Sequence, residues 1–419
     1  MAFIHRNIEE KLVKALNKQE TSILIGPRQV GKSTLLKQIA SKSKKKARFL
    51  NFEDPRDLEV FRDGYKSFIN EVTEDLVFID EFHYYPNITS VFKAVYDLNP
   101  EKKIYASGSS SLEIHKHLKE SLAGRRIDTQ IYPLSFEEHL RQFDEILPSL
   151  DNSISVKTNL HLRSRMHKFL KYGAMPGLIQ LNQCDLNDED YQIEVQEKLY
   201  GIYKTYIAKD IKTFLKDESI INFNTLIEYF VMNDAQLLSI NSLAQKLNIP
   251  ESQIRKQLEV MHETFTLGLL RPFYKNKTKE ISKSSKTYFY DLGIANAINN
   301  DYRDLNKRND MAQGAILENF VYWELRKSLD IRYSLNYWRS YDDQEVDFIL
   351  IKDTEIMALE VKFSNSVKIP SGIKSFIRAY PETKLAVVLS DAEELVTEYQ
   401  GVPVYFYKHY RAARIKELL

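Results

Sequence analysis

The chain has 419 residues, which is too long for one compact core and predicts two to four domains. It is 43% hydrophobic and 28% charged with a formal net charge of +1, so no global field draws the protein onto nucleic acid. The single cysteine, Cys184, excludes an internal disulfide framework. No apolar run reaches the length of a membrane span, and residues 1–16 predict an amphipathic helix rather than a signal peptide. We expect a soluble, cytoplasmic protein without a membrane partner.

A glycine-rich loop joins a predicted buried strand, residues 22–25, to a predicted helix over residues 34–40. The glycines let the backbone curl, so that successive N–H groups and the helix N-terminus hold phosphate oxygens. In this pattern Lys32 reaches the β- and γ-phosphates and Ser33 binds Mg²⁺. The predicted ATP-binding residues are Gly26, Pro27, Arg28, Gln29, Val30, Gly31, Lys32, Ser33 and Thr34.

An acidic pair follows the predicted apolar strand at residues 76–79. Asp80 is predicted to hold the hydration shell of the Mg²⁺, and Glu81 to polarise the attacking water. Acidic pairs are also common in surface turns, so the prediction depends on the phosphate loop upstream. His83, two residues later, receives no role.

Two further sites are candidates for contact with the γ-phosphate. Ser109 follows a predicted strand at residues 103–106, although an ordinary Ser/Gly turn fits this stretch equally well. Arg125 and Arg126 precede a predicted strand at residues 127–132. An arginine there can reach the nucleotide of a neighbouring subunit and neutralise its transferring phosphoryl group. A plain surface pair of arginines is the alternative.

The succession of GPRQVGKST, VFIDEFHYYP, ASGSSS and LAGRR with YPLSFEEHL resembles a bacterial and archaeal group of AAA-type ATPases. Members of this group pair an N-terminal P-loop ATPase with a C-terminal PD-(D/E)XK nuclease-like domain. The resemblance covers most of the chain. It implies one more strand between the first helix and the acidic pair, for which residues 47–55 are the candidate. An arginine acting in trans implies a homo-oligomer.

The middle of the chain is predicted to be helical and then to form a small winged-helix module. Residues 149–235 would be a helical lid over the ATP site. Within residues 236–308, two helices at 239–247 and 252–265 precede two strands joined by a basic link. Contact with nucleic acid and service as a protein–protein spacer are both open. The residues that would meet phosphates are Arg255, Lys256, Lys275, Lys277, Lys279, Lys283 and Lys286.

The C-terminal segment carries the pattern Asp…Glu-x-Lys of PD-(D/E)XK nucleases. Asp347 and Glu360 lie on two predicted strands of one hairpin, and Lys362 shares a face with Glu360. The two carboxylates would hold Mg²⁺ or Mn²⁺, with Glu318 of the preceding helix as a further ligand. Lys362 would orient or deprotonate a water, and the metal would stabilise charge on a scissile phosphate. A scaffold without cleavage, in which Glu360 and Lys362 form a buried ion pair, is the alternative.

The sequence thus predicts an α/β protein: an AAA-type P-loop NTPase with a parallel sheet and helical lid, a winged-helix module, and a C-terminal mixed α/β nuclease-like domain. The predicted domains span residues 1–148, 149–235, 236–308 and 309–419. The expected function is ATP hydrolysis coupled to a metal-dependent nuclease-like domain that acts on nucleic acid, DNA rather than RNA. The alternative is a regulatory ATPase switch or protein remodeller whose nuclease-like domain binds without cutting.

Overall fold

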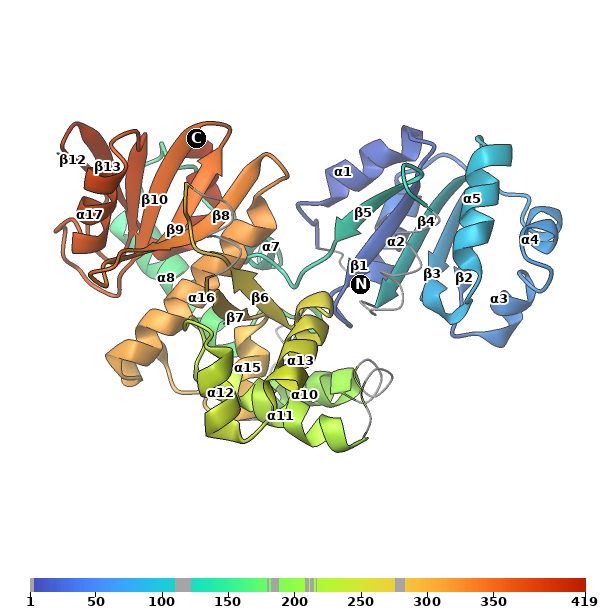
Figure 1. Ribbon diagram of the computed structural model, residues 1–419. Coiled ribbons are helices and arrows are strands. Elements are labelled where there is room, and N and C mark those ends of the chain that lie inside the picture. Colours follow the sequence, from blue (N-terminus) through green and yellow to red (C-terminus); the bar gives the residue numbers. More distant parts are fainter. Residues whose placement is uncertain are drawn as a thin grey trace.

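The computed structural model describes residues 4–109, 122–178, 188–207, 217–275 and 283–419, together with residues 181, 211 and 215. Its N-terminal part is a five-stranded parallel sheet in the order β2-β3-β4-β1-β5 (Figure 1). The strands are β1 (Thr21–Gly26), β2 (Ala47–Asn51), β3 (Leu76–Asp80), β4 (Lys103–Ser109) and β5 (Arg126–Gln130). The predicted additional strand at residues 47–55 is therefore confirmed as β2.

Helices cover both faces of this sheet, because its inner strands are apolar on both sides. The helices of this part are α1 (Glu9–Lys14), α2 (Lys32–Ser41), α3 (Pro55–Glu59), α4 (Tyr65–Glu71) and α5 (Ile88–Leu98). In α5 the buried residues Ile88, Val91, Phe92 and Val95 recur at helical spacing and form one apolar stripe. The predicted amphipathic helix at the N-terminus is shorter than expected and consists of α1.

After β5 the chain crosses to the rest of the molecule, which begins with a helical region. Its helices are α7 (Phe136–Arg141), α8 (Val156–Tyr172), α10 (Asp188–Tyr206), α11 (Asp217–Met232), α12 (Ile240–Leu247), α13 (Glu251–Glu263) and α15 (Leu292–Asn299). The strands β6 (Leu267–Leu270) and β7 (Lys286–Phe289) pair antiparallel as a ribbon. The helix pair and the ribbon expected in the middle are therefore present, and Ser239 caps α12 by accepting from Ser242 N. Lys277 and Lys279 lie outside the described residues.

The C-terminal part is a six-stranded mixed sheet in the order β12-β13-β11-β10-β9-β8, flanked by α16 (Asp310–Ser328) and α17 (Ser371–Ala379). Its strands are β8 (Tyr333–Arg339), β9 (Glu345–Lys352), β10 (Glu355–Val361), β11 (Leu385–Leu389), β12 (Leu395–Tyr399) and β13 (Val402–Tyr407). A 3₁₀ segment, His409–Leu418, closes the described chain against α16. The predicted hairpin is confirmed, since β9 and β10 pair antiparallel with Leu359 opposite Phe348.

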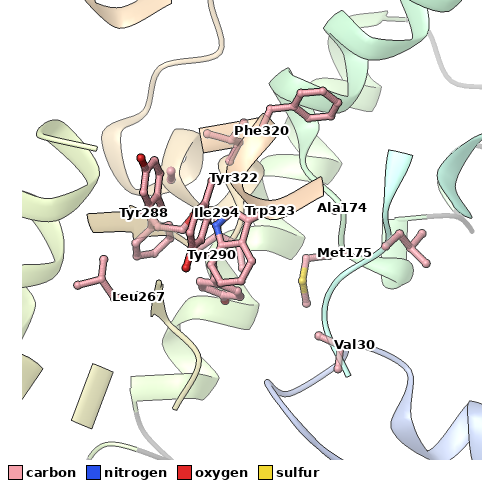
Figure 2. Close-up of a cluster of buried hydrophobic side chains, with 14 of the residues drawn as sticks. Val30, Ala174, Met175, Leu267, Tyr288, Tyr290, Ile294, Phe320, Tyr322 and Trp323 are labelled. Atoms are coloured by element: carbon pink, nitrogen blue, oxygen red, sulfur yellow. Dashed lines mark hydrogen bonds between the residues drawn. The ribbon is translucent and has the colours of Figure 1, made fainter. Parts of the chain in front are cut away.

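One continuous apolar core joins these parts. It contains Val30 of the glycine-rich loop, Met175 of the segment after α8, and Trp323 of α16 (Figure 2). Two smaller clusters lie on the other face of each large sheet. The phosphate-loop region therefore shares buried side-chain contacts with the C-terminal half. Among the described helices, none is long and apolar enough to cross a membrane.

Candidate nucleotide site and C-terminal acidic cluster

The glycine-rich loop lies at the carboxyl end of β1, where the strand order changes direction. Ligands of open α/β sheets bind at this kind of switch point. Gly31 has φ of 92° and begins α2, a conformation that favours glycine, and it supplies no capping side chain to the first turn. The first-turn amides of α2 are therefore oriented as an anion site. At Gly26 a Cβ atom would lie 2.0 Å from the carbonyl oxygen of Ile131, so only glycine fits there.

Lys32 is buried and is aimed back along the loop. Its Nζ donates to the carbonyl oxygens of Gly26 and Pro27, each at 2.8 Å. The ammonium is thereby held above the curled backbone, where the predicted phosphates would lie. Ser33 and Thr34 are exposed in the first turn of α2. The loop, the lysine and the hydroxyls fit a bound triphosphate.

The acidic pair lies beside the loop on β3. Asp80 Oδ1 accepts from Ser107 Oγ of the neighbouring strand β4 and from Glu81 N at 3.2 Å. Ser107 is fully buried and orients the carboxylate. Glu81 has a φ of 51°, a left-handed conformation that is strained for a residue with a side chain and is commonly found at functional sites. These contacts fit a carboxylate that helps hold Mg²⁺, with a second carboxylate beside it.

The serine that contacts Asp80 is Ser107 rather than the predicted Ser109. Ser109 pairs with Gly26 through the β4–β1 ladder, so its backbone lies next to the start of the loop. Its side chain lies outside the described part of the structure. Residues two apart share a face of a strand, so the sequence "SGS" contained the signal for either serine.

Glu81 has two basic neighbours. Its Oε2 lies 3.3 Å from Nδ1 of His83, and its Oε1 lies 4.0 Å from Nη1 of Arg28 in the glycine-rich loop. Burial lowers the pKa of His83, and the charges of Arg28 and Lys32 lower it further, to about 4. His83 is therefore neutral at pH 7. The sequence analysis gave this histidine no role, yet it lies against the predicted base.

Arg125 and Arg126 lie at the opposite end of the sheet from the glycine-rich loop. Arg126 pairs with Thr21, the first residue of the parallel strand β1, whereas the loop begins at Gly26. Five residues of strand span roughly 16 Å. Arg125 Nε lies 2.9 Å from Asp97 Oδ1, and Arg126 Nε lies 2.9 Å from Asp128 Oδ1. Neither arginine reaches its own subunit's loop, so a role across a subunit boundary stays a prediction.

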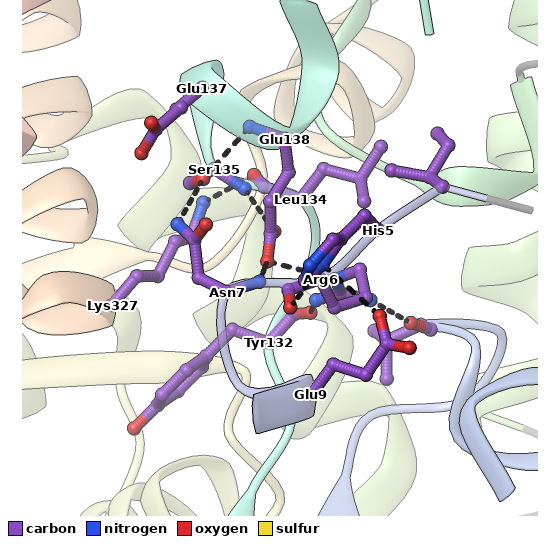
Figure 3. Close-up of polar contacts among 12 residues, drawn as sticks. His5, Arg6, Asn7, Glu9, Tyr132, Leu134, Ser135, Glu137, Glu138 and Lys327 are labelled. Carbon is purple, nitrogen blue, oxygen red and sulfur yellow. Dashed lines mark hydrogen bonds and ion pairs between the residues drawn. The ribbon is translucent and has the colours of Figure 1, made fainter. Parts of the chain in front are cut away.

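Arg6 connects the glycine-rich loop to the segment after β5 (Figure 3). Its guanidinium donates to Val30 O at 2.9 Å and to Tyr132 O at 2.7 Å, and its Nε lies 3.1 Å from Glu138 Oε1. Burial acts to raise the pKa of Glu138, but the charge of Arg6 and the amides of Ser135 and Asn7 bring it below its ordinary value. Both side chains are buried, so this is a fixed, charged link.

The same segment is held from the other side by α16. Glu324 accepts from Phe136 N at 3.1 Å with both oxygens, and Lys327 Nζ donates to Leu134 O at 2.8 Å. Burial raises the pKa of Glu324 to about 7. Ser135 and Glu138 form a capping box at the start of α7, the one part of this network that the sequence pattern S-x-x-E announces. Contacts therefore run from Val30 in the loop to α16 in the C-terminal part.

The C-terminal acids meet as the sequence analysis expected. Asp347 on β9 accepts from Val361 N at 2.8 Å through Oδ2, and Glu360 Oε1 lies 2.7 Å from Lys362 Nζ. Glu318 of α16 reaches the same cluster. Among the described residues, Glu360 Oε2 is buried without a hydrogen-bond partner. Burial and the charge of Asp347 raise the pKa of Glu360 to about 8, so that it holds a proton at pH 7.

A cation that the sequence analysis placed on a nucleic-acid surface occupies this cluster. Lys286, the first residue of β7, is 3% exposed. Its Nζ lies 2.8 Å from Glu318 Oε1 and 3.7 Å from Asp347 Oδ1, and it also pairs with Glu345. Burial by itself lowers the pKa of Lys286, but the charges of Glu318, Asp347 and Glu345 outweigh it and raise the pKa. Lys286 is therefore not available to meet phosphates, which corrects its assignment.

The acidic cluster does not have the arrangement of a metal site. Across the described ranges, no group of three or more His, Cys, Asp or Glu side chains is placed to hold a metal ion. Glu318 Oε1 is already engaged by Lys286 and by the hydroxyl of Tyr288 at 2.7 Å. The predicted ligands Glu318, Asp347 and Glu360 come together, but around an ammonium group.

The other basic residues of the middle module are at the surface. Arg255 is exposed on α13 and lies 3.3 Å from Glu251 on the same helix. Lys275 is exposed and lies 2.8 Å from Glu382 of the C-terminal part. These pairs offset part of the positive charge that phosphate contact would use.

Three family models match the chain in succession. Residues 18–140 match a model described as an AAA domain. Residues 163–305 and 313–410 match two models described as domains of unknown function, DUF8612 and DUF4143. The chain therefore begins with an AAA domain. Two domains of unknown function follow it.

The relatives along the full length are uncharacterized proteins. The protein MJ1544 of Methanocaldococcus jannaschii is 27% identical over 394 residues, with 91% of this chain and 82% of that protein covered. A protein of Haemophilus influenzae is 25% identical, covering 85% and 86%, and Rv2008c of Mycobacterium tuberculosis is 24% identical, covering 93% and 80%.

Two solved structures illustrate the likeness in fold. The Walker-type ATPase PABY2304 of Pyrococcus abyssi has a TM-score of 0.49 at 15% identity, covering 71% of this chain and 96% of that one. The Thermotoga maritima RuvB Holliday junction branch migration motor has a TM-score of 0.32 at 14% identity, covering 67% and 96%.

Proposed function

We propose that the AAA domain binds ATP with Mg²⁺ and hydrolyses it, and that the nucleotide state is passed to the C-terminal half through Arg6. The observation that carries this proposal is the glycine-rich loop with Lys32 bound to its own carbonyls, beside an Asp80 carboxylate oriented by Ser107. A P-loop and a metal-holding aspartate on the neighbouring strands are the two parts that phosphoryl transfer requires.

The roles follow from the positions of the side chains. Lys32 exchanges its hydrogen bonds with Gly26 and Pro27 for phosphate oxygens, while Ser33 and Asp80 hold the cation. Glu81 orients the attacking water and accepts its proton. Mg²⁺, when bound, offsets charge on the phosphoryl group that is transferred. Arg125 or Arg126 would act on the nucleotide of a neighbouring copy, in a homo-oligomer.

Calorimetry with ATP and a non-hydrolysable analogue tests this proposal. Lys32→Ala is expected to abolish the heat of association, while Lys37→Ala, an exposed lysine of the same helix, leaves it unchanged. Glu81→Gln is expected to bind ATP and to hydrolyse it at least about 100-fold more slowly, because general-base catalysis contributes about 10²–10⁴-fold. Wild-type protein that binds no adenine nucleotide would end the proposal.

Coupling to the C-terminal half rests on the Arg6 contacts. A phosphate bound under Val30 would alter the loop carbonyl to which Arg6 donates, and Arg6 also holds Tyr132 O and Glu138. Glu138 caps α7, whose first amide is held by Glu324 of α16. The alternative in which the C-terminal half binds a partner without cutting is the one that these contacts favour, because they describe a switch rather than a cleavage site.

A metal-dependent nuclease acting on DNA is the second candidate. The convergence of Asp347, Glu360 and Lys362, together with the unpartnered Glu360 Oε2, supports it. Incubation with ATP, Mg²⁺ or Mn²⁺ and a panel of DNA and RNA substrates tests it. Cleavage that disappears in both Asp347→Ala and Lys362→Ala would establish this candidate, whereas unchanged nucleic acid beside active ATP hydrolysis would remove it.

A further inference from the structure

Lys286 brings together two parts of the chain that match different families. It lies in the segment that matches DUF8612, and its three carboxylate partners lie in the segment that matches DUF4143. Glu318 comes from α16, and Glu345 and Asp347 come from β9. The lysine reaches them from the first position of β7 and is 3% exposed.

The setting of the lysine is built rather than incidental. Tyr288, two residues further along β7, donates to the same Glu318 oxygen and stacks on Tyr322 of α16 with ring centroids 4.1 Å apart. The chain after β6 also joins the C-terminal sheet, since Phe273 N donates to Tyr337 O on β8. The ribbon is therefore anchored on both sides of the acidic cluster.

The carboxylate oxygens that contact Lys286 are those that a divalent cation would need. Hard cations such as Mg²⁺ and Mn²⁺ bind carboxylate oxygens at short distance. A divalent ion placed between Glu318 and Asp347 would lie against the ammonium, where like charges repel strongly in a buried setting. The second oxygen of Asp347 accepts from Val361 N, so it cannot turn away without losing that bond.

We propose that Lys286 is the resident cation of this cluster. Its ammonium group stands among Glu318, Glu345 and Asp347 in the place of a divalent metal. The acidic site of the intact protein therefore takes no metal ion, and the ion cluster fastens the β6–β7 ribbon to the C-terminal domain. This inference does not depend on ATP binding.

Mn²⁺ binding to the full chain, without nucleotide, tests the proposal by electron paramagnetic resonance of the free ion. The wild type is expected to leave the Mn²⁺ signal unchanged at this cluster. Lys286→Ala is expected to gain one site per chain that binds Mn²⁺ at least tenfold more tightly than the wild type. Lys286→Arg, which keeps the charge, gains none. Lys286→Ala combined with Asp347→Asn loses the gained site, which assigns it.

The proposal is overturned if the wild type binds one Mn²⁺ per chain and Asp347→Asn removes it, or if folded Lys286→Ala gains no site. Circular dichroism reports whether each variant folds. If Lys286→Ala does not fold, the wild type and Asp347→Asn decide: a shared absence of Mn²⁺ binding upholds the proposal. ATP binding, measured by calorimetry on the same samples, shows separately whether the AAA domain is active.

Discussion

At the scale of single residues, the neighbourhood of Glu81 is the part of the nucleotide site that the printed sequence describes least. The acidic pair is visible, but the left-handed backbone of Glu81 and its approach to His83 and Arg28 are not. A neutral imidazole beside the base can hold the carboxylate in one orientation without neutralising it. His83 is thus a positioning residue for the proposed hydrolysis.

The pKa of His83 predicts how stability depends on pH. Its folded-state pKa is about 4, below the ordinary 6.5, so its contribution is present above pH 6.5 and is lost as pH falls towards 4. Between pH 7 and pH 5 the wild type should lose about 2 kcal/mol more unfolding free energy than His83→Asn. Urea titration of both proteins at the two pH values measures this difference.

A second histidine provides the control for this prediction. His161 is a half-exposed histidine paired with Glu145, away from the nucleotide site, and His161→Asn should show a much smaller difference between the two pH values. Equal pH dependence of wild type and His83→Asn would contradict a buried, neutral imidazole.

At the scale of secondary-structure elements, α7 is the junction between the two halves. Its capping box uses Ser135 and Glu138, Glu138 also pairs with Arg6, and its first amide is bound by Glu324. A helix of only six residues has little stability of its own. Its position therefore depends on partners from both the glycine-rich loop and α16.

Replacing Arg6 by lysine tests this junction while keeping the buried charge. Lysine lacks the planar fork that lets arginine donate to Val30 O and Tyr132 O together. Arg6→Lys should retain the fold and lose about 1 kcal/mol of stability, the net value of one hydrogen bond. Addition of an ATP analogue should slow amide hydrogen exchange in α16 of the wild type and should do so much less in Arg6→Lys.

Arg62→Lys is the matched control, because Arg62 forms an exposed pair with Glu59 on the AAA domain's surface. It should leave both stability and the exchange response unchanged. An undiminished response of α16 in Arg6→Lys would show that the signal takes another route.

At the scale of the whole molecule, the shared core predicts cooperative unfolding. The buried cluster runs from Leu12 of α1 through Val30 and Trp323 to Ile415 near the end of the chain. Arg411, which is fully buried, adds hydrogen bonds to Ser149 O and Asn152 O at 2.6 and 2.9 Å. Separating the parts would expose apolar surface on each of them.

The two tryptophans make this prediction measurable. Trp323 and Trp338 both lie in the C-terminal part, so their fluorescence reports that part, whereas binding of a fluorescent ATP analogue reports the AAA domain. Both signals should disappear at the same urea concentration. Two midpoints separated by more than about 1 M, a large fraction of a typical unfolding range, would show that the halves unfold independently.

The sequence by itself determined the P-loop, the acidic pair after β3, the parallel sheet with its extra strand, and the hairpin that places Asp347 beside Glu360. Each of these depends on one contiguous stretch, where glycine positions, strand alternation and helical spacing act over a few residues. Only the tertiary structure decided that Arg6 holds Val30 and Tyr132, which are 24 and 126 positions away, and that Lys286 enters the acidic cluster. The net energy of a buried ion pair depends on which distant partners surround it, because desolvation and attraction nearly cancel. No local pattern records those partners, so a lysine that looked like a surface charge proved to be buried.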